Sequence, residues 1–200
     1  GAPGWGVGGR RGLGGVVLAV GPPMEVDHHE AAKAARRVDL AGSVVIPGRV
    51  NAHTHLDLTH LGPRPYREEA GFVGWVEAVR LGRVSDAAAI ADSVRRGIAL
   101  ARAGGTVAVG DIAGAPRGGA SLVPLQELRA AGMLGVSYLE FFGIGAKTEA
   151  LQERLTGLLD AAGAGEERLR VGLQPHAPNT VGLRLYEWAA RLAAARGVPI

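Results

Sequence analysis

The sequence predicts an α/β fold in which strands and helices alternate from about residue 47 onward, preceded by a separate β-rich segment. Three observations support this prediction. Short apolar runs bounded by glycine or proline recur, amphipathic helical patterns fill the gaps between them, and the first 45 or so residues are glycine-rich without a long helical pattern. Such alternation implies parallel strands joined by right-handed crossovers. Periodicity alone does not distinguish an open α/β sheet from a (β/α)8 barrel.

The N-terminal segment, residues 1–46, is predicted to form part of a small β domain. Its strand candidates are residues 16–20 and 44–46, which are β-type apolar runs among glycines. The segment is therefore expected to be a domain separate from the remainder, residues 47–200.

The remainder is predicted to consist of strand and helix units. The strand candidates are residues 50–55, 106–112, 134–142 and 170–175. The helix candidates are residues 86–103, 149–162 and 183–196, the first with Ser85 as its N-cap. Residues 198–200 are expected to begin a fifth strand. That makes about four and a half βα units, so we expect the chain to be part of a longer barrel that is inactive without its other half.

Composition excludes several classes of site. The chain has no cysteine, so disulfides, thiolate zinc sites and cysteine nucleophiles are excluded, and a metal would need His, carboxylate or water ligands. The pI is near 9.8, but the net charge is only +3 and the arginines are scattered, so no nucleic-acid partner is expected. No apolar run approaches the roughly 20 residues of a membrane helix. We expect a cytoplasmic protein with no membrane partner.

The strongest chemical signal is the pair His53 and His55. Residues two apart on a strand point to the same face, so the pair would present two imidazoles at the carboxyl end of the first predicted barrel strand. Active sites of such barrels lie at that end. We therefore predict that both histidines bind a metal. The alternative is that they only cap a strand in a polar loop.

The surrounding residues resemble a known family. The run Pro47-Gly48-Arg49-Val50-Asn51-Ala52-His53-Thr54-His55-Leu56 is similar to the first barrel strand of the amidohydrolase superfamily. Residues 104–111 resemble its second strand, and residues 174–180, which include Pro-His-Ala-Pro, its fourth. The resemblance is greatest to the branch that deaminates or dechlorinates purines, pyrimidines and triazines. Within it, residues 57–59 and 138–143 look similar to aminofutalosine deaminases.

This resemblance implies a small β-sandwich before a metal-dependent hydrolase barrel, and deamination of an aminated, purine-like heterocycle. One divalent ion, zinc or iron, would activate water for the reaction. The resemblance also places His176 where a histidine contacts the substrate, and a direct bond to the metal is the alternative. The family's proton-transferring His-x-x-Glu motif is expected on a fifth strand, so no catalytic residue is assigned within these 200 residues.

Two carboxylates are further candidates for substrate binding. Glu140 and Asp111 lie near the carboxyl ends of predicted strands, where side chains face the active site of a barrel. Either carboxylate could instead neutralise an arginine or cap the next helix, and for Asp111 this structural role is as open as substrate binding.

Other enzyme and non-enzyme readings remain open. A cyclic-amide hydrolase would bridge two metals with a carboxylated lysine on the fourth strand, but only Lys147 lies anywhere near it. A chlorohydrolase, and a barrel relative without metal that only binds a ligand, are further alternatives. The expected partner is a small heterocyclic substrate, and homo-oligomerisation is left open.

The long segment between the first strand and the next helix carries one more pattern. Phe72, Val73, Val76 and Val79 recur at helical spacing beside Trp75. This predicts either a lid over the pocket or a surface helix packed on the barrel. His60, in the same segment, has no assigned role.

Overall fold

A computed structural model describes residues 6–9, 17–40, 42–114, 119–145, 148–163 and 168–200. Lys147, the lysine considered above, lies outside these residues. The chain divides into two compact units, Gly1–Pro47 and Gly48–Ile200. No helix in the described part of the chain is both long and apolar enough to cross a membrane.

The N-terminal unit is built on a two-stranded antiparallel sheet. Strand β1 (Gly6–Gly9) pairs with β2 (Val17–Gly21), which lies within one residue of the predicted strand. The short helix α1 (Pro23–Asp27) and the 3-10 turn η1 (Glu30–Ala32) follow. The strand predicted at residues 44–46 is wrong, because no described segment pairs with it and all three side chains are exposed.

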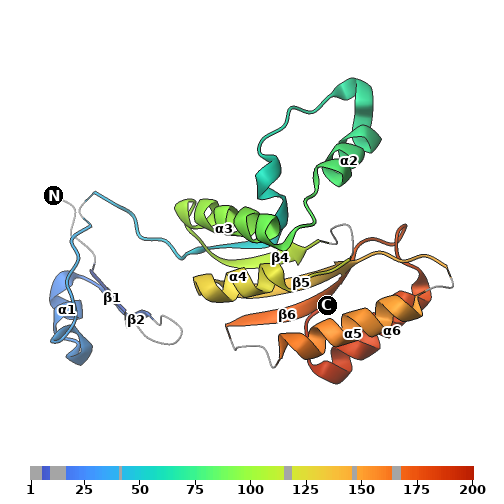
Figure 1. The fold of residues 1–200 in the computed structure, drawn as a ribbon. Helices are drawn as coiled ribbons and strands as arrows, with labels where there is room; N and C mark the ends of the chain where they lie inside the picture. Colours follow the sequence, from blue (N-terminus) through green and yellow to red (C-terminus); the bar gives the residue numbers. More distant parts are fainter. Residues whose placement is uncertain (1–5, 10–16, 41, 115–118, 146–147, 164–167) are drawn as a thin grey trace. The chain divides into compact units, whose positions relative to one another are not determined.

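The second unit contains a four-stranded parallel sheet (Figure 1). Its strands are β3 (Arg49–Thr54), β4 (Thr106–Ala113), β5 (Leu134–Phe141) and β6 (Leu169–Pro175), each within one residue of its predicted bounds. They lie side by side in the order β3-β4-β5-β6. A doubly wound sheet would reverse its order at a switch point. The uninterrupted order is instead that of part of a (β/α)8 barrel, which answers the question left open by periodicity.

The fifth strand predicted at residues 198–200 does not form. Its link to the sheet is one backbone hydrogen bond, in which the Leu173 N–H donates to the Pro199 carbonyl at 2.9 Å. Proline has no N–H with which to continue a ladder of hydrogen bonds. The prediction of a strand in this segment is therefore wrong for this structure.

Four helices accompany the sheet: α3 (Ala87–Ala103), α4 (Val123–Ala131), α5 (Glu149–Ala162) and α6 (Leu183–Arg196). The bounds of α5 and α6 match the prediction. The predicted N-cap Ser85 is wrong, because the Asp86 carboxylate accepts the hydrogen bond from the Ala89 N–H at 3.0 Å. No bounds were predicted for α4, which is short and has a proline in its first turn.

The core of this unit lies between the sheet and its helices. Each helix contributes the apolar stripe that its periodicity indicates, and strands β4, β5 and β6 contribute the side chains opposite. The buried set includes Val94, Val109, Leu125, Leu139, Leu155, Leu173 and Leu185. Burial of one such leucine stabilises the fold by about 1.5–3 kcal/mol. Because the strands are parallel, their carboxyl ends lie at the same edge of the sheet.

The segment between β3 and α3 leaves the body of the unit and returns. It comprises the 3-10 turns η2 (Leu56–Leu61) and η3 (Glu68–Ala70) and the helix α2 (Gly71–Gly82). The predicted helix therefore forms, but none of its residues is buried, and Figure 1 shows it standing away from the sheet. The reading as a helix packed on the barrel is wrong for this structure, and the lid stays a proposal.

Candidate metal and substrate site

The two histidines lie where β3 ends. His53 is in the strand and His55 immediately precedes η2, so the strand geometry brings both imidazoles to its carboxyl end. Their ring centroids are 5.4 Å apart, with the rings edge to face at 67°. The Nδ1 atom of His55 is buried and has no hydrogen-bond partner among the described residues. A buried nitrogen without a hydrogen-bond partner, beside a second imidazole, is a donor that could bind a cation.

The surroundings of His55 favour its neutral form. Burial, followed by the positive charge of Arg83 and the neighbouring His53, lowers the pKa of His55 from 6.5 to about 4. A neutral imidazole keeps the lone pair that a metal ligand needs. At neutral pH, therefore, this ring is ready to bind a metal without first losing a proton.

Asp111 lies on β4, directly beside the end of β3. It is fully buried, and its Oδ1 accepts a hydrogen bond from the Leu56 N–H at 3.0 Å, whereas its Oδ2 has no partner among the described residues. Burial raises the pKa of Asp111 from 3.8 to about 7. One carboxylate oxygen thus fixes the backbone just after His55, a structural role different from the two expected from the sequence.

A second set of hydrogen bonds holds the turn after the histidines. The hydroxyl of Ser93, on α3, lies 2.9 Å from the Asp57 carbonyl and 3.2 Å from the Leu56 carbonyl. It also accepts a hydrogen bond from the His60 N–H at 3.0 Å. Because the His60 Nε2 lies 2.9 Å from the Gly82 carbonyl, this imidazole links η2 to the end of α2. The histidine without an assigned role is therefore part of the frame around the site.

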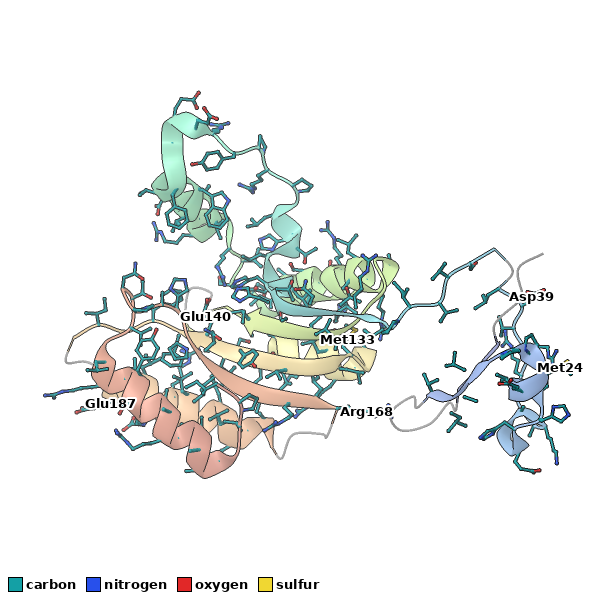
Figure 2. All side chains as sticks on the ribbon, turned by 180° about the vertical axis from the view of Figure 1, so that it is seen from behind. Met24, Asp39, Met133, Glu140, Arg168 and Glu187 are labelled. Carbon is teal, nitrogen blue, oxygen red and sulfur yellow. The ribbon has the colours of Figure 1, made fainter. Side chains whose placement is uncertain are left out.

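Glu140 lies near the carboxyl end of β5, at the opposite end of the strand from Met133 (Figure 2). It is buried, and its Oε2 lies 3.8 Å from Nη2 of Arg83. The same guanidinium donates from Nη1 to Oδ2 of Asp57 at 2.8 Å. Sequence reasoning considered an unspecified arginine beside Glu140 but did not identify Arg83. In the sequence, Arg83 is marked only by its position just after the helical pattern of the long segment between the first strand and the next helix.

His176 follows β6 at the same end of the sheet. Its backbone N–H donates to the Phe141 carbonyl at 3.1 Å, and its ring lies against Phe142 with centroids 4.3 Å apart. Nδ1 is 2.8 Å from the Thr180 hydroxyl, which itself donates to the Ala177 carbonyl. The hydroxyl therefore accepts from Nδ1–H, so the lone pair of a neutral ring is on Nε2.

The positive charge of Arg83 connects the two sides of the site. Burial and this guanidinium together lower the pKa of His176, and Arg83 also contributes to the lowered pKa of His55. Three of the residues predicted from the sequence, His55, Glu140 and His176, thus interact with one arginine. Among the described residues, however, no group of three or more His, Asp or Glu side chains is arranged to hold a metal ion. Among those residues, His53 and His55 are therefore a candidate pair of metal ligands.

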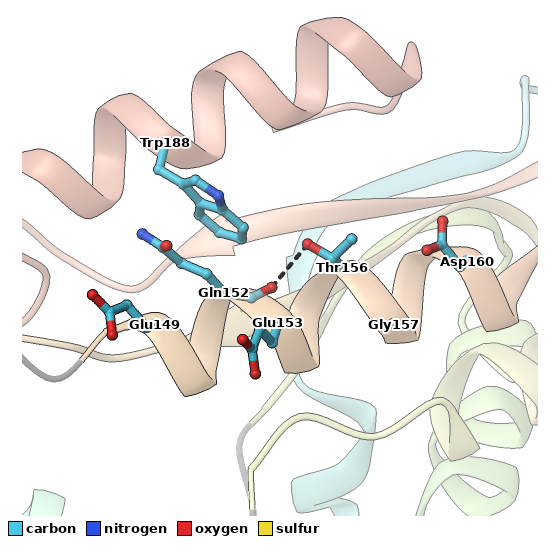
Figure 3. A pocket seen from close by; sticks show the side chains of 7 residues that line it. All are labelled: Glu149, Gln152, Glu153, Thr156, Gly157, Asp160 and Trp188. Carbon is cyan, nitrogen blue, oxygen red and sulfur yellow. Dashed lines mark hydrogen bonds between the residues drawn. The ribbon is translucent and has the colours of Figure 1, made fainter.

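An open groove of about 550 Å³ lies elsewhere, on the helical layer (Figure 3). It runs along α5, with Trp188 of α6 above it, and none of the predicted site residues lines it. Its lining includes Glu149, Gln152, Glu153, Thr156, Asp160 and Trp188. The groove is therefore separate from the chemistry predicted at the strand ends.

Comparison with known proteins gave relatives in sequence, although no family model matches the chain. The chain is 34% identical to aminodeoxyfutalosine deaminase of Deinococcus radiodurans, over 98% of its own length and 45% of that protein. It is 31% identical to 5-methylthioadenosine/S-adenosylhomocysteine deaminase of Haloarcula marismortui, over 84% of its length and 37% of the relative. The chain thus spans less than half the length of these curated relatives.

Solved structures share the fold. Triazine hydrolase from Arthrobacter aurescens superposes with a TM-score of 0.71 at 20% identity, covering 90% of this chain and 44% of the other. An adenosine deaminase from Xanthomonas campestris with bound zinc gives a TM-score of 0.70 at 21% identity, covering 92% and 41%.

Proposed function

Since the chain belongs to the amidohydrolase superfamily, in the branch of metal-dependent deaminases and chlorohydrolases, we propose that it serves hydrolytic deamination of an aminated, purine-like heterocycle. Water adds to the ring carbon that carries the amino group, and the carbon–nitrogen bond then breaks. One proton of the water goes to the amino group, which leaves as ammonia, and the other goes to a ring nitrogen. The observation that carries this proposal is the pair His53 and His55 at the carboxyl end of β3, with a buried, unpaired Nδ1 on His55.

The chemistry of the donors fits a divalent ion such as zinc. His53 and His55 would hold it through neutral imidazole nitrogens, a donor type that suits zinc and iron and does not suit calcium. Zinc is favoured because related structures carry it, the Xanthomonas adenosine deaminase among them. When bound, such an ion lowers the pKa of water from 15.7 to about 7 and so supplies the nucleophile.

The chain's other residues would bind and orient the substrate. The Nε2 lone pair of His176 would accept a hydrogen bond from a ring N–H, and the Glu140 carboxylate would accept one from an N–H or hydroxyl group. Asp111 would act indirectly, because it fixes the backbone after His55. The substrates of the curated relatives, which are adenosine-type nucleosides by name, support a purine nucleoside as the first class to test.

The test uses the full-length protein and measures bound metal by elemental analysis and ammonia release from a panel of aminated purines, pyrimidines and triazines. We expect His53→Ala and His55→Ala to lose both. His176→Ala should keep its metal and lose kcat/KM. His28→Ala, which removes an exposed imidazole of the N-terminal unit, is the matched control and should behave as wild type.

Three outcomes would contradict the proposal. Unchanged metal content in His53→Ala and His55→Ala would remove the metal site from β3. Chloride release from chlorinated triazines without ammonia release would identify a chlorohydrolase. Ligand binding with no turnover of any compound would favour the barrel relative that has lost its chemistry.

A further inference from the structure

Arg83 occupies a central position among the strand ends. It follows α2, and its side chain is only 14% exposed. Its Nη1 donates to Asp57, which follows β3, and its Nη2 forms an ion pair at 3.8 Å with Glu140 of β5. The guanidinium therefore spans the distance from the first strand of the sheet to the third.

The strand between them makes room for this side chain. Gly114 directly follows β4, and a Cβ atom there would overlap both terminal nitrogens of Arg83. The guanidinium thus lies against the backbone at the end of β4. Any larger residue at position 114 would push it away from Asp57 and Glu140.

The backbone that carries Arg83 is anchored to the body of the unit through the last residue of α2. The preceding carbonyl, of Gly82, is bonded to His60 at 2.9 Å, and His60 is bonded through its N–H to Ser93 of the buried helix α3. The position of Arg83 therefore depends on the body of the unit. An arginine held at both its backbone and its guanidinium has little freedom to move.

We propose that Arg83 is a positioning residue for the deamination proposed above, on which this inference rests: its guanidinium clamps Asp57 and Glu140 and so holds the Glu140 carboxylate toward the substrate. The two carboxylates are 7% and 4% exposed, so neither is held in place by water alone. A planar guanidinium offers five N–H donors in a fixed fork and serves both carboxylates at once, whereas a lysine ammonium is a single point of charge.

The experiment compares Arg83→Ala and Arg83→Lys with Arg80→Ala. Arg80 lies on the same segment, but it is exposed and, among the described residues, its ion pair is with Glu77 on its own helix. We expect Arg83→Ala to lower kcat/KM roughly 100-fold with its metal content unchanged, since small misplacements in an active site have effects of that order. Arg83→Lys should recover only part of the loss. Arg80→Ala should match wild type.

Chemical rescue separates positioning from a general loss of structure. Millimolar guanidinium chloride should restore part of the activity of Arg83→Ala, and the same concentration of sodium chloride should not. If Arg83→Ala is as active as Arg80→Ala, or if guanidinium and sodium chloride have the same effect on it, the inference is overturned.

A second measurement tests the clamp without relying on turnover. In a double-mutant cycle of Arg83→Met and Glu140→Gln, the changes in unfolding free energy should be non-additive. Each single substitution removes one member of the buried ion pair and leaves the charge of the other member buried, whereas the double substitution removes both charges. Additive effects would overturn the clamp even if the enzyme is active. If wild type releases no ammonia, the proposed function fails, and this cycle still decides whether Arg83 and Glu140 act together.

Discussion

Helices α2 and α3 follow one another in the chain and both carry apolar residues at helical spacing, yet only α3 is buried. In α3 the side chains of Ile90, Val94 and Ile98 are at most 4% exposed. In α2, Phe72 and Val73 are 70% and 79% exposed. Periodicity thus indicates that a helix forms, whereas the fold decides whether its apolar face meets a partner.

The partner of α3 is the turn that carries the site. Helix α3 packs against η2, and Gly97 permits the close approach, since a Cβ there would lie 2.5 Å from Oγ1 of Thr59. Ser93 adds hydrogen bonds to the same turn. The buried helix α3 therefore holds the turn that follows His55, whereas the apolar face of α2 is exposed.

The largest expected effect is the loss of stability when a charge is placed on the buried face of α3, compared with the same change on α2. We expect Val94→Asp to destabilise the protein by about 4 kcal/mol or more, because Val94 is fully buried and the carboxylate would find no partner. The matched change Val73→Asp on α2 should stay within about 0.5 kcal/mol. Denaturant unfolding measures both, and equal losses would show that α2 is covered in solution.

A smaller effect, confined to a range of pH, is expected at Asp111. Its pKa is raised from 3.8 to about 7 in the folded protein, so the fold binds this proton more tightly than the unfolded chain does. The stability that it contributes is fully present below about pH 3.8 and is lost as the pH rises to about 7. Asp111→Asn keeps an acceptor for the Leu56 N–H but has no proton to lose.

Urea unfolding from pH 4 to pH 8 tests this difference. The stability of Asp111→Asn relative to wild type should increase with pH and level off above about 7. The control is Glu77→Gln on α2. The hydrogen bond from Arg80 lowers the pKa of this exposed carboxylate from 4.5, so the difference between this variant and wild type should not change with pH above about 5.5. A constant difference between Asp111→Asn and wild type would show that Asp111 is ionised throughout.

The smallest effect on stability is expected on the face of α2. Phe72 and Trp75 stack on each other with ring centroids 5.9 Å apart, and both are at least half exposed. Replacing both with serine should change the unfolding free energy by no more than about 0.5 kcal/mol for each residue. Light scattering should decrease, since exposed apolar patches promote association. A loss above about 2 kcal/mol would mean that another surface packs on them.

Much of the fold was predictable from local patterns. The periods of a strand and of a helix are properties of neighbouring residues, so the four strands were located within one residue and α5 and α6 at their bounds. The same local rule placed His53 and His55 together at the end of β3, because residues two apart on a strand share a face.

Tertiary structure alone decided what surrounds those histidines. The hydrogen bond from Leu56 to Asp111 joins residues 55 positions apart, and that from Arg83 to Asp57 joins residues 26 apart. Local periodicity cannot predict contacts between residues so far apart in the sequence, because these contacts depend on which strands lie side by side. The order β3-β4-β5-β6, the exposure of α2 and the position of Arg83 between Asp57 and Glu140 all follow from long-range packing of the sheet and its helices.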